Sequence, residues 1–336
     1  MMGQRLCRLI PSAKSRALGL LLALPVLAAQ LAFAQTAQDQ SALATETSAA
    51  GDTADMATAR APANIFSMPA KKLFGMQTLP AHLKAAAVGT YALGCLAGGV
   101  QLPQTGPTWQ VMRPSRNRAW GTPQIIAFLE RISAEAKAKA GWNGFLVGDM
   151  AQPRGGPMKT GHASHQIGLD ADVWFTPMPD HVLSADERET KVPLEMVINH
   201  STINSDNWSE SRAKLIETVA RDPQVARIFV HPPIKRALCD SATGSDRSWL
   251  AKVRPLYGHT FHFHIRLKCP EGMSSCKDQW TPKPDDGTGC GKELAYWYSD
   301  APWKPHKPAP GPHRPPPPPL TLAGLPAQCR AVIAAP

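Results

Sequence analysis

Residues 260–267 read Thr-Phe-His-Phe-His-Ile-Arg-Leu, with polar and apolar side chains in strict alternation. An alternation with a period of two predicts a half-buried β-strand, because successive side chains of a strand point to opposite faces. His262, His264 and Arg266 therefore share one face of this strand. Two imidazoles side by side on a strand are a starting point for a metal site, and a packed or surface pair is the alternative interpretation. They do not complete a coordination shell, so other ligands must come from another segment.

Residues 161–172, Gly-His-Ala-Ser-His-Gln-Ile-Gly-Leu-Asp-Ala-Asp, are the candidate segment. The alternation in residues 169–175 predicts a second strand with Asp172 on its polar face. His165 precedes Asp172 by seven residues, on the loop that enters this strand. One imidazole and one carboxylate from here, together with His264, would form a three-ligand zinc site. Such a site keeps its fourth position for a water whose pKa falls to about 7.

The first 34 residues predict a cleavable signal peptide, with four basic residues, an apolar run over residues 17–29 and Ala32-Phe33-Ala34 as a cleavage site. The apolar run is shorter than the roughly 20 residues of a membrane span, and no later segment approaches that length. We therefore expect an exported protein with no stable membrane span. Cleavage lowers the formal charge from +10 to about +6. The remaining basic residues are scattered, which argues against a nucleic-acid partner.

Cysteine usage agrees with export. Loss of Cys7 with the signal leaves an even number of cysteines, which predicts disulfides in an oxidising compartment. The short spacing between Cys269 and Cys276 favours a local bridge, but the sequence leaves the full pairing open. No C-x-x-C spacing occurs, so a zinc–cysteine cluster is not favoured.

Composition divides the rest of the chain. Residues 35–63 contain few large apolar side chains and predict a disordered linker. Residues 64–300 have the pattern of one globular domain, and residues 301–336 form a proline-rich tail that Cys329 ties back to the body. The periodicity predicts helices over residues 123–140, 208–222, 233–239 and 245–252, and strands over residues 144–150, 169–175 and 227–230.

These segments resemble the penicillin-insensitive murein endopeptidases, periplasmic zinc peptidases that cut D,D cross-links in peptidoglycan. The wider group includes lysostaphin-type peptidases, D-alanyl-D-alanine peptidases and the hedgehog signalling domain. The pairing of H-x(6)-D with H-x-H is specific to the wider group, and the run over residues 161–170 to the endopeptidases. The match covers about residues 90–300 and Cys329. It implies a compact single α+β domain, with a small, mainly antiparallel sheet that carries the zinc site and is flanked by helices.

The resemblance implies zinc ligands at His165, Asp172 and His264, with His162 as a further metal position or a lining residue. Two further metal positions of the family fall on Asn199 and Thr202, which argues against a second metal. The resemblance also implies the disulfides Cys95–Cys329, Cys239–Cys290 and Cys269–Cys276.

Roles for the remaining polar residues follow from their positions. His262 lies two residues from His264 on the same face, which suits a general base or a transition-state stabiliser. His259 is the alternative base or the proton donor to the leaving amine. Asp170 or Asp149 is expected to orient a ligand imidazole, with an ordinary turn or cap carboxylate as the alternative. Two residues are candidates for binding a substrate carboxylate: Arg154, for which a solvated surface position is the alternative, and Arg266.

Together with the predicted signal peptide and metal site, the resemblance implies a periplasmic zinc endopeptidase that hydrolyses D-alanyl–diaminopimelate cross-links in peptidoglycan. A D,D-carboxypeptidase on the same scaffold is one rival. A non-enzymatic cell-wall or zinc-binding protein is the other. The residues leave open the oligomeric state, for which a homodimer is one option, and the role of the tail.

Overall fold

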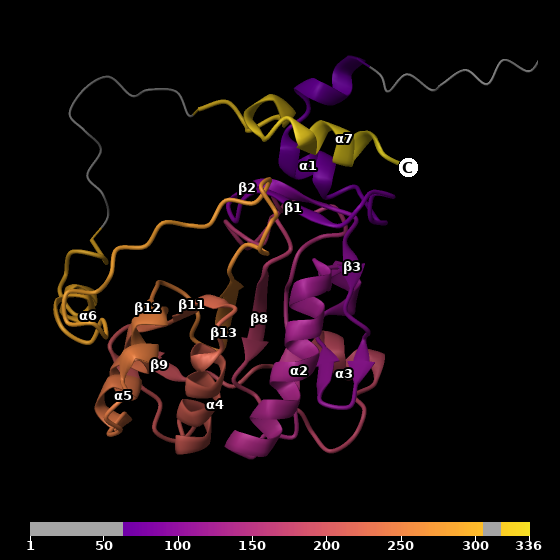
Figure 1. Cartoon of the computed structure of the whole chain (residues 1–336). Helices are drawn as coiled ribbons and strands as arrows, with labels where there is room; N and C mark the ends of the chain where they lie inside the picture. The colour runs from indigo at the N-terminus through magenta and orange to yellow at the C-terminus, as the bar shows by residue number, and fades with distance from the viewer. Residues whose placement is uncertain (1–62, 305–316) are drawn as a thin grey trace, which may run out of the picture. The chain divides into compact units, whose positions relative to one another are not determined.

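A seven-stranded mixed sheet lies at the centre of the fold (Figure 1), in the order β12-β11-β13-β8-β7-β5-β4. The computed structural model describes residues 63–304 and 317–336. The predicted signal peptide, and the predicted linker up to residue 62, lie outside the described residues. The strands are β4 Thr105–Gly106, β5 Trp109–Val111, β7 Phe145–Val147, β8 Asp170–Trp174, β11 Val225–Val230, β12 Val253–Pro255 and β13 His262–Leu267.

Most neighbours in this sheet are antiparallel, and only the β11–β12 and β5–β7 pairs are parallel. Within the described residues, three two-stranded sheets accompany it. The predicted α+β domain with a mainly antiparallel sheet is thereby confirmed. The paired strands of the smaller sheets are β1 Ala86–Thr90 with β2 Leu93–Ala97, β3 Val100–Gln101 with β6 Trp120–Gly121, and β9 Val197–Asn199 with β10 Thr202–Ile203.

Helix α2 spans Pro123–Ala140, as predicted. Pro123 occupies the first turn, where its missing N–H costs nothing, and Gly141 ends the helix at a φ of 70°. The predicted short helix over residues 245–252 is instead a 3-10 turn, η3 (Ser248–Lys252). The other helices are α1 Ala70–Phe74, α3 Ala185–Thr190, α4 Glu210–Arg221, α5 Pro232–Ser241, α6 Lys292–Trp297 and α7 Gln328–Ala334, with 3-10 turns η1 Ala63–Ser67, η2 Pro114–Arg116 and η4 Leu322–Gly324.

The main core lies between the sheet and the helices α2 and α4, which stand in front of it in Figure 1. Phe263 and Ile265 of β13 point into this core, as the alternation predicted. The prediction of half-buried strands was wrong, however, because every residue of β8 and β13 is buried. The polar face is covered as well: Tyr91, on the β1–β2 turn, stacks 4.2 Å over the guanidinium of Arg266 and donates a hydrogen bond to the carbonyl of Leu267.

The end of the chain packs on the N-terminal elements. Cys95 of β2 and Cys329 of α7 form a disulfide, and α7 shares an apolar cluster with α1 and β1. Arg154 is 7% exposed and donates from Nη1 to the carbonyls of Val332, Ile333 and Ala335. Both predictions for Arg154, a substrate ligand and a solvated surface residue, were wrong, since its guanidinium holds the C-terminal segment in place.

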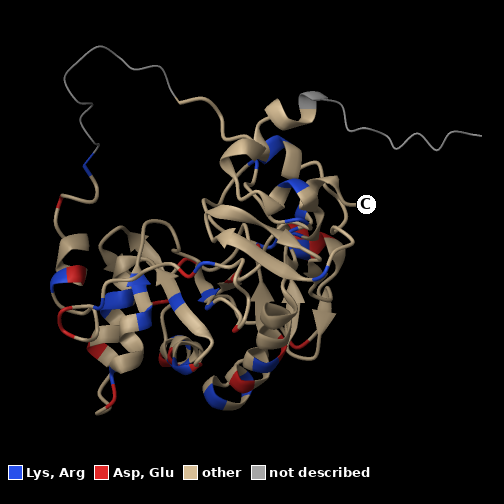
Figure 2. Ribbon diagram, turned by 45° about the horizontal axis from the view of Figure 1, so that its top comes forward, with Lys and Arg blue, Asp and Glu red and all other residues tan. Residues whose placement is uncertain are grey.

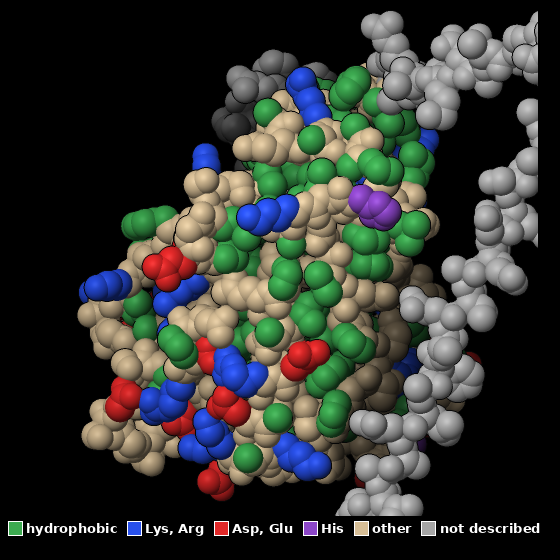
Figure 3. Space-filling model, turned by 45° about the vertical axis from the view of Figure 1, so that its right-hand side comes forward, with side chains coloured by type: hydrophobic (Ala, Val, Ile, Leu, Met, Phe, Trp, Pro, Cys, Tyr) green, Lys and Arg blue, Asp and Glu red, His purple; other side chains and the backbone are tan. Residues whose placement is uncertain are grey.

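Charged side chains lie on many elements of the ribbon in Figure 2, where Asp and Glu lie near several of the Lys and Arg. Surface pairs such as Lys139–Glu135 and Arg221–Glu217 illustrate this local balance. On the face in Figure 3, side chains of both signs lie next to one another in the lower part. No helix within the described residues is long and apolar enough to cross a membrane.

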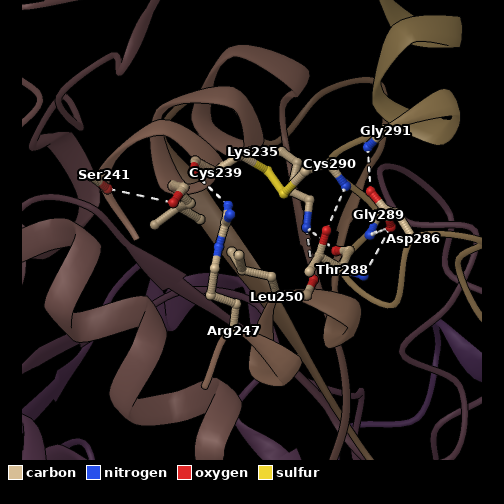
Figure 4. The surroundings of a disulfide bond; sticks show 11 residues. Lys235, Cys239, Ser241, Arg247, Leu250, Asp286, Thr288, Gly289, Cys290 and Gly291 are labelled. Atoms are coloured by element: carbon tan, nitrogen blue, oxygen red, sulfur yellow. Dashed lines mark hydrogen bonds between the residues drawn. A yellow bond between two sulfur atoms is a disulfide. The ribbon is translucent and has the colours of Figure 1, made fainter. Parts of the chain in front are cut away.

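A second anchored region surrounds the disulfide Cys239–Cys290 (Figure 4). It joins α5 to the loop that precedes α6. Lys235, one turn before Cys239, is fully buried and donates from Nζ to the carbonyls of Leu250 and Thr288. The third disulfide, Cys269–Cys276, closes a short loop after β13. The three bridges are the pairs that the resemblance implied.

Arg154→Gln should lower the free energy of unfolding by about 2–3 kcal/mol, because the change leaves buried carbonyls of the C-terminal segment without donors. Denaturant titration at neutral pH measures this. Arg131→Gln is the matched control. Arg131 of α2 is half-exposed and pairs with Glu135 and Asp222, and its loss should cost about 0.5 kcal/mol. Equal losses in the two variants would contradict the anchoring role of Arg154.

Burial lowers the pKa of Lys235 to about 7, with Arg254 and Arg247 adding to the effect and Glu293 and Asp286 opposing it. The unfolded chain then binds the extra proton between pH 7 and the ordinary lysine value, so this group makes folding more favourable as pH rises through that window.

Lys235→Met should therefore remove a pH-dependent part of the unfolding free energy. The difference between wild type and variant should change by roughly 2–3 kcal/mol between pH 7 and pH 9. Urea titrations at several pH values measure it, with the exposed Lys214→Met on α4 as the control. A difference that does not vary with pH would show that Lys235 stays charged in the folded protein.

Candidate metal centre

The register of β13 against β8 places the predicted polar residues together. Residues opposite one another in an antiparallel pair project from the same side of the sheet. His264 lies opposite Asp172, and His262 lies opposite Trp174. The two imidazoles and the carboxylate therefore rise from one face, with the carboxylate next to the second imidazole.

The loop between β7 and β8 brings the remaining histidines over this face. His165 is fully buried and has a φ of 65°, a left-handed conformation that side chains other than glycine rarely adopt. Its backbone N–H donates to Oδ2 of Asp170 at 3.0 Å, which holds the strained turn. Strain of this kind concentrates at functional sites.

Three ligand atoms from these segments converge. His165 Nε2 lies 3.1 Å from His264 Nδ1, and Asp172 Oδ1 lies 3.4 Å from the first and 3.3 Å from the second. Bonds of about 2.0–2.2 Å to one tetrahedral ion separate the donor atoms by about 3.3–3.6 Å. Asp172 Oδ1 is buried and accepts no hydrogen bond of good geometry from any described residue. The donor set and its spacing fit a metal ion.

His162 lies at the edge of this group. One nitrogen from His162, one from His165 and an oxygen of Asp172 all lie within 4.8 Å of one another. However, His162 Nε2 is 3.0 Å from Asp149 Oδ2 and 3.6 Å from Asp172 Oδ2. In this arrangement Asp149 holds the imidazole beside the three convergent atoms, a position compatible with lining the site or with binding the metal.

Two further carboxylates, Asp170 and Asp149, lie next to different imidazoles. Asp170 Oδ1 lies 3.1 Å from Nε2 of His264 and also accepts a hydrogen bond from Arg266 at 2.8 Å. Asp149 is shared between His162, Arg116 and Arg118. Burial would raise the pKa of Asp170, but Arg266 and His264 hold it far below its usual range. A permanent anion at Asp170 favours the His264 tautomer that carries its proton on Nε2 and leaves Nδ1 free.

The protonation states of two of the three groups also suit metal binding. For the third, His264, burial would lower the pKa, but Asp170 and Asp172 raise it. Burial lowers the pKa of His165 to about 4. Burial would raise the pKa of Asp172, but the imidazoles of His262 and His165 hold it well below its usual range. A neutral imidazole and an ionised carboxylate are the forms that bind a metal.

The two proposed catalytic histidines lie on one side of the convergent atoms. His262 Nε2 is 3.7 Å from Asp172 Oδ2, while its Nδ1 is buried without a hydrogen-bond partner among the described residues. The ring of His259 is centred 5.0 Å from that of His262, and its φ of 58° marks a second strained turn. Burial lowers the pKa of His262, and burial together with His264 and His262 lowers that of His259 to about 3. Both rings are therefore neutral at pH 7.

Two cavities meet at this cluster, one of about 850 Å³ and one of about 340 Å³. His162 and His262 line both. The larger cavity is also lined by His259, His264 and the exposed Trp280, and the smaller one by Asp172 and Asp149. The convergent atoms thus lie between two spaces that could each hold part of a chain.

Some predicted positions do not join the cluster. Arg154 lies under the C-terminal segment, as described above. Asn199 accepts hydrogen bonds from Ser201, and the ring of His200 lies 4.8 Å from that of Trp303. This segment, on which the resemblance placed the further metal positions, thus makes hydrogen bonds and ring contacts of its own.

Sequence reasoning missed several lining residues, among them Tyr91, Arg227 and Trp280. Tyr91 lies on a turn far away in the sequence, and Trp280 lies in an irregular segment after β13. No pattern ties either residue to the histidines. Arg227 carried a usable signal, because a charged residue inside the apolar run of a central strand indicates a polar side of that strand.

Comparison with known proteins identifies the family. The model of the penicillin-insensitive murein endopeptidase family matches residues 87–334. The endopeptidase of that name from Haemophilus influenzae is 46% identical over 217 residues, which are 64% of this chain and 74% of that protein. Those from Yersinia enterocolitica and Klebsiella pneumoniae are 41% and 39% identical, over 74% and 76% of this chain and 85% and 89% of theirs. The chain belongs to the penicillin-insensitive murein endopeptidase family.

Proposed function

We propose that this protein is a zinc-dependent endopeptidase that hydrolyses the D-alanyl–diaminopimelate cross-links of peptidoglycan. Family membership makes it a peptidase that acts on murein. The observation that carries the finer proposal is the convergence of His165 Nε2, His264 Nδ1 and Asp172 Oδ1 within 3.4 Å of one another. Two imidazoles and one carboxylate, with room for water, are the donor set of catalytic zinc.

The bound zinc would lower the pKa of a water molecule and polarise the scissile carbonyl. His165, Asp172 and His264 would hold it, with His162 as an additional ligand or a lining residue. The protein's own part is to keep these donors in the binding form. Asp170 does this for His264, because its anionic Oδ1, 3.1 Å from Nε2, favours the proton on that nitrogen and leaves the Nδ1 lone pair for the metal.

His262 is the proposed general base. It is neutral and buried, and its Nε2 lies 3.7 Å from Oδ2 of Asp172, beside the group that would hold the metal. It would take the proton of a water molecule as that water attacks the carbonyl. His259, whose Nδ1 lies 3.0 Å from the carbonyl of Tyr257, would give a proton to the leaving amine or replace His262 as the base.

The two cavities favour an endopeptidase over a D,D-carboxypeptidase. Cleavage inside a cross-link requires space on both sides of the metal, and cavities of about 850 and 340 Å³ provide it. A carboxypeptidase has to accommodate only one terminal D-alanine on the amine side of its substrate.

We also propose that the protein works in the periplasm, after removal of residues 1–34 as a signal peptide. The three disulfides support this, because such bonds persist in oxidising compartments.

His264→Ala should abolish zinc binding and reduce murein hydrolysis by at least about 10³-fold, since the change removes both a ligand and the partner of Asp170. Metal content of the purified variant and release of fragments from purified murein measure the two effects. The exposed His181→Ala should behave as wild type. Retained zinc with full activity in the His264 variant would end the metal model.

His262→Ala should keep its zinc and lose turnover by about 10²–10⁴-fold, because a base contributes to the reaction without holding the metal. Metal analysis alongside steady-state kinetics separates the two roles. Loss of zinc in this variant would make His262 a ligand instead.

The choice between enzyme classes rests on the products. Digestion of purified murein should convert cross-linked dimers into monomers, and a chelator should stop the reaction. Release of D-alanine with the dimers left intact would identify a carboxypeptidase. No hydrolysis with zinc bound would identify a binding protein.

A further inference from the structure

A buried arginine on the floor of the larger cavity has no acidic partner. Arg227 of β11 is 8% exposed and lies opposite Arg266 in the register of β11 and β13. Like charges opposite one another destabilise a sheet, and a buried charge without a counter-ion is costly. A position of this kind calls for a physical reason beyond packing.

Each neighbouring arginine has its own carboxylate. Arg266 donates to both oxygens of Asp170, and Arg254 of β12 pairs with Glu293 at 2.7 Å. Arg227 donates only from Nη2 to the backbone carbonyl of Trp280, at 2.9 Å. Among the described residues no carboxylate lies within ion-pair distance of it. Nε and Nη1 of Arg227 make no hydrogen bond within residues 63–304 and 317–336.

The position of Arg227 relative to the metal centre is fixed by the sheet. Phe229, two residues further along β11, lies opposite His264, so Arg227 is one step along the strand from the row of the ligands. That step is roughly 6–7 Å. Arg227 and His264 line the same cavity of about 850 Å³.

We propose that Arg227 binds the carboxylate on the α-carbon of the amine-side residue, next to the scissile amide. This assignment rests on the proposed function. In a D-alanyl–diaminopimelate link that carboxylate lies one carbon beyond the amide nitrogen, close to the metal-bound carbonyl. A guanidinium whose Nε and Nη1 are both free suits bidentate binding of a carboxylate. The larger cavity then receives the amine side of the cross-link, and the smaller one receives the acyl side.

Other arginines near the site are committed elsewhere. Arg266, the residue that the sequence suggested, uses Nε and Nη2 for Asp170 and Nη1 for Gln279. Arg113, in the smaller cavity, donates to backbone carbonyls of residues 188–191. Arg116 is half-exposed and holds Asp149.

The test compares two synthetic cross-linked peptides, identical except that the amine-side α-carboxylate is free in one and amidated in the other. Wild type should prefer the free acid by about 10- to 100-fold in kcat/KM, the range expected for a charge-assisted contact. Arg227→Gln should lose this preference through a lower kcat/KM on the free acid, with little change on the amide. Arg254→Gln, which removes a neighbouring cation that already has a partner, should retain the preference.

Thermal unfolding separates this role from a structural one. The midpoint of Arg227→Gln should equal or exceed that of wild type, because the change removes an unpaired buried charge, and Arg227→Lys should recover part of the preference. Equal losses on both peptides, or a lower midpoint with the preference retained, would overturn the assignment. If wild type cleaves murein but does not distinguish the two peptides, this assignment fails alone; if it cleaves no cross-link at all, the proposed function fails with it.

Discussion

One buried carboxylate, Asp170, connects the separate parts of this site. Its Oδ2 accepts the backbone N–H of His165, and its Oδ1 lies beside Nε2 of His264, while both oxygens accept hydrogen bonds from Arg266. The loop that supplies one proposed ligand and the strand that supplies another are therefore fixed to the same group. A metal site needs this kind of support, since ligands from distant segments hold their geometry only when second contacts orient them.

The two faces of the sheet have different roles. The apolar residues of β8, β11 and β13 pack with α2 and α4 into the main core, and this burial provides the larger part of the stability. The opposite face buries a layer of histidines, carboxylates and arginines under the β1–β2 turn and the loop before β8. Such a layer contributes little net stability, because desolvation of the charges offsets their attraction. The apolar core allows the polar face to be arranged for chemistry.

Much of the site was predictable because it follows local patterns. The alternation in residues 260–267 predicted which side of β13 carries His262 and His264, and the proline and glycine around residues 123–140 marked the ends of α2. Burial of the polar face was not predictable, because the residues that cover it, such as Tyr91, come from distant turns. The role of Arg154 depends on carbonyls more than 170 residues away, and a sequence pattern does not encode that contact. Arg227 lacks an acidic partner because Asp170 pairs with Arg266 and Glu293 pairs with Arg254. Only the folded structure shows these pairs.

The attachment of α7 to the β1–β2 hairpin also affects the order in which the fold is completed during synthesis. Cys95 and Cys329 are separated by 234 positions, and Arg154 donates hydrogen bonds to the carbonyls of residues 332, 333 and 335. Since a ribosome delivers the chain from its N-terminus, the β1–β2 hairpin has no partner for this surface until α7 has been made. Tyr91, on the turn of that hairpin, lies over the polar layer that contains the proposed metal ligands. A nascent chain that lacks α7 therefore lacks the support of the turn that covers the proposed metal site, so this site is completed only after α7 has been made.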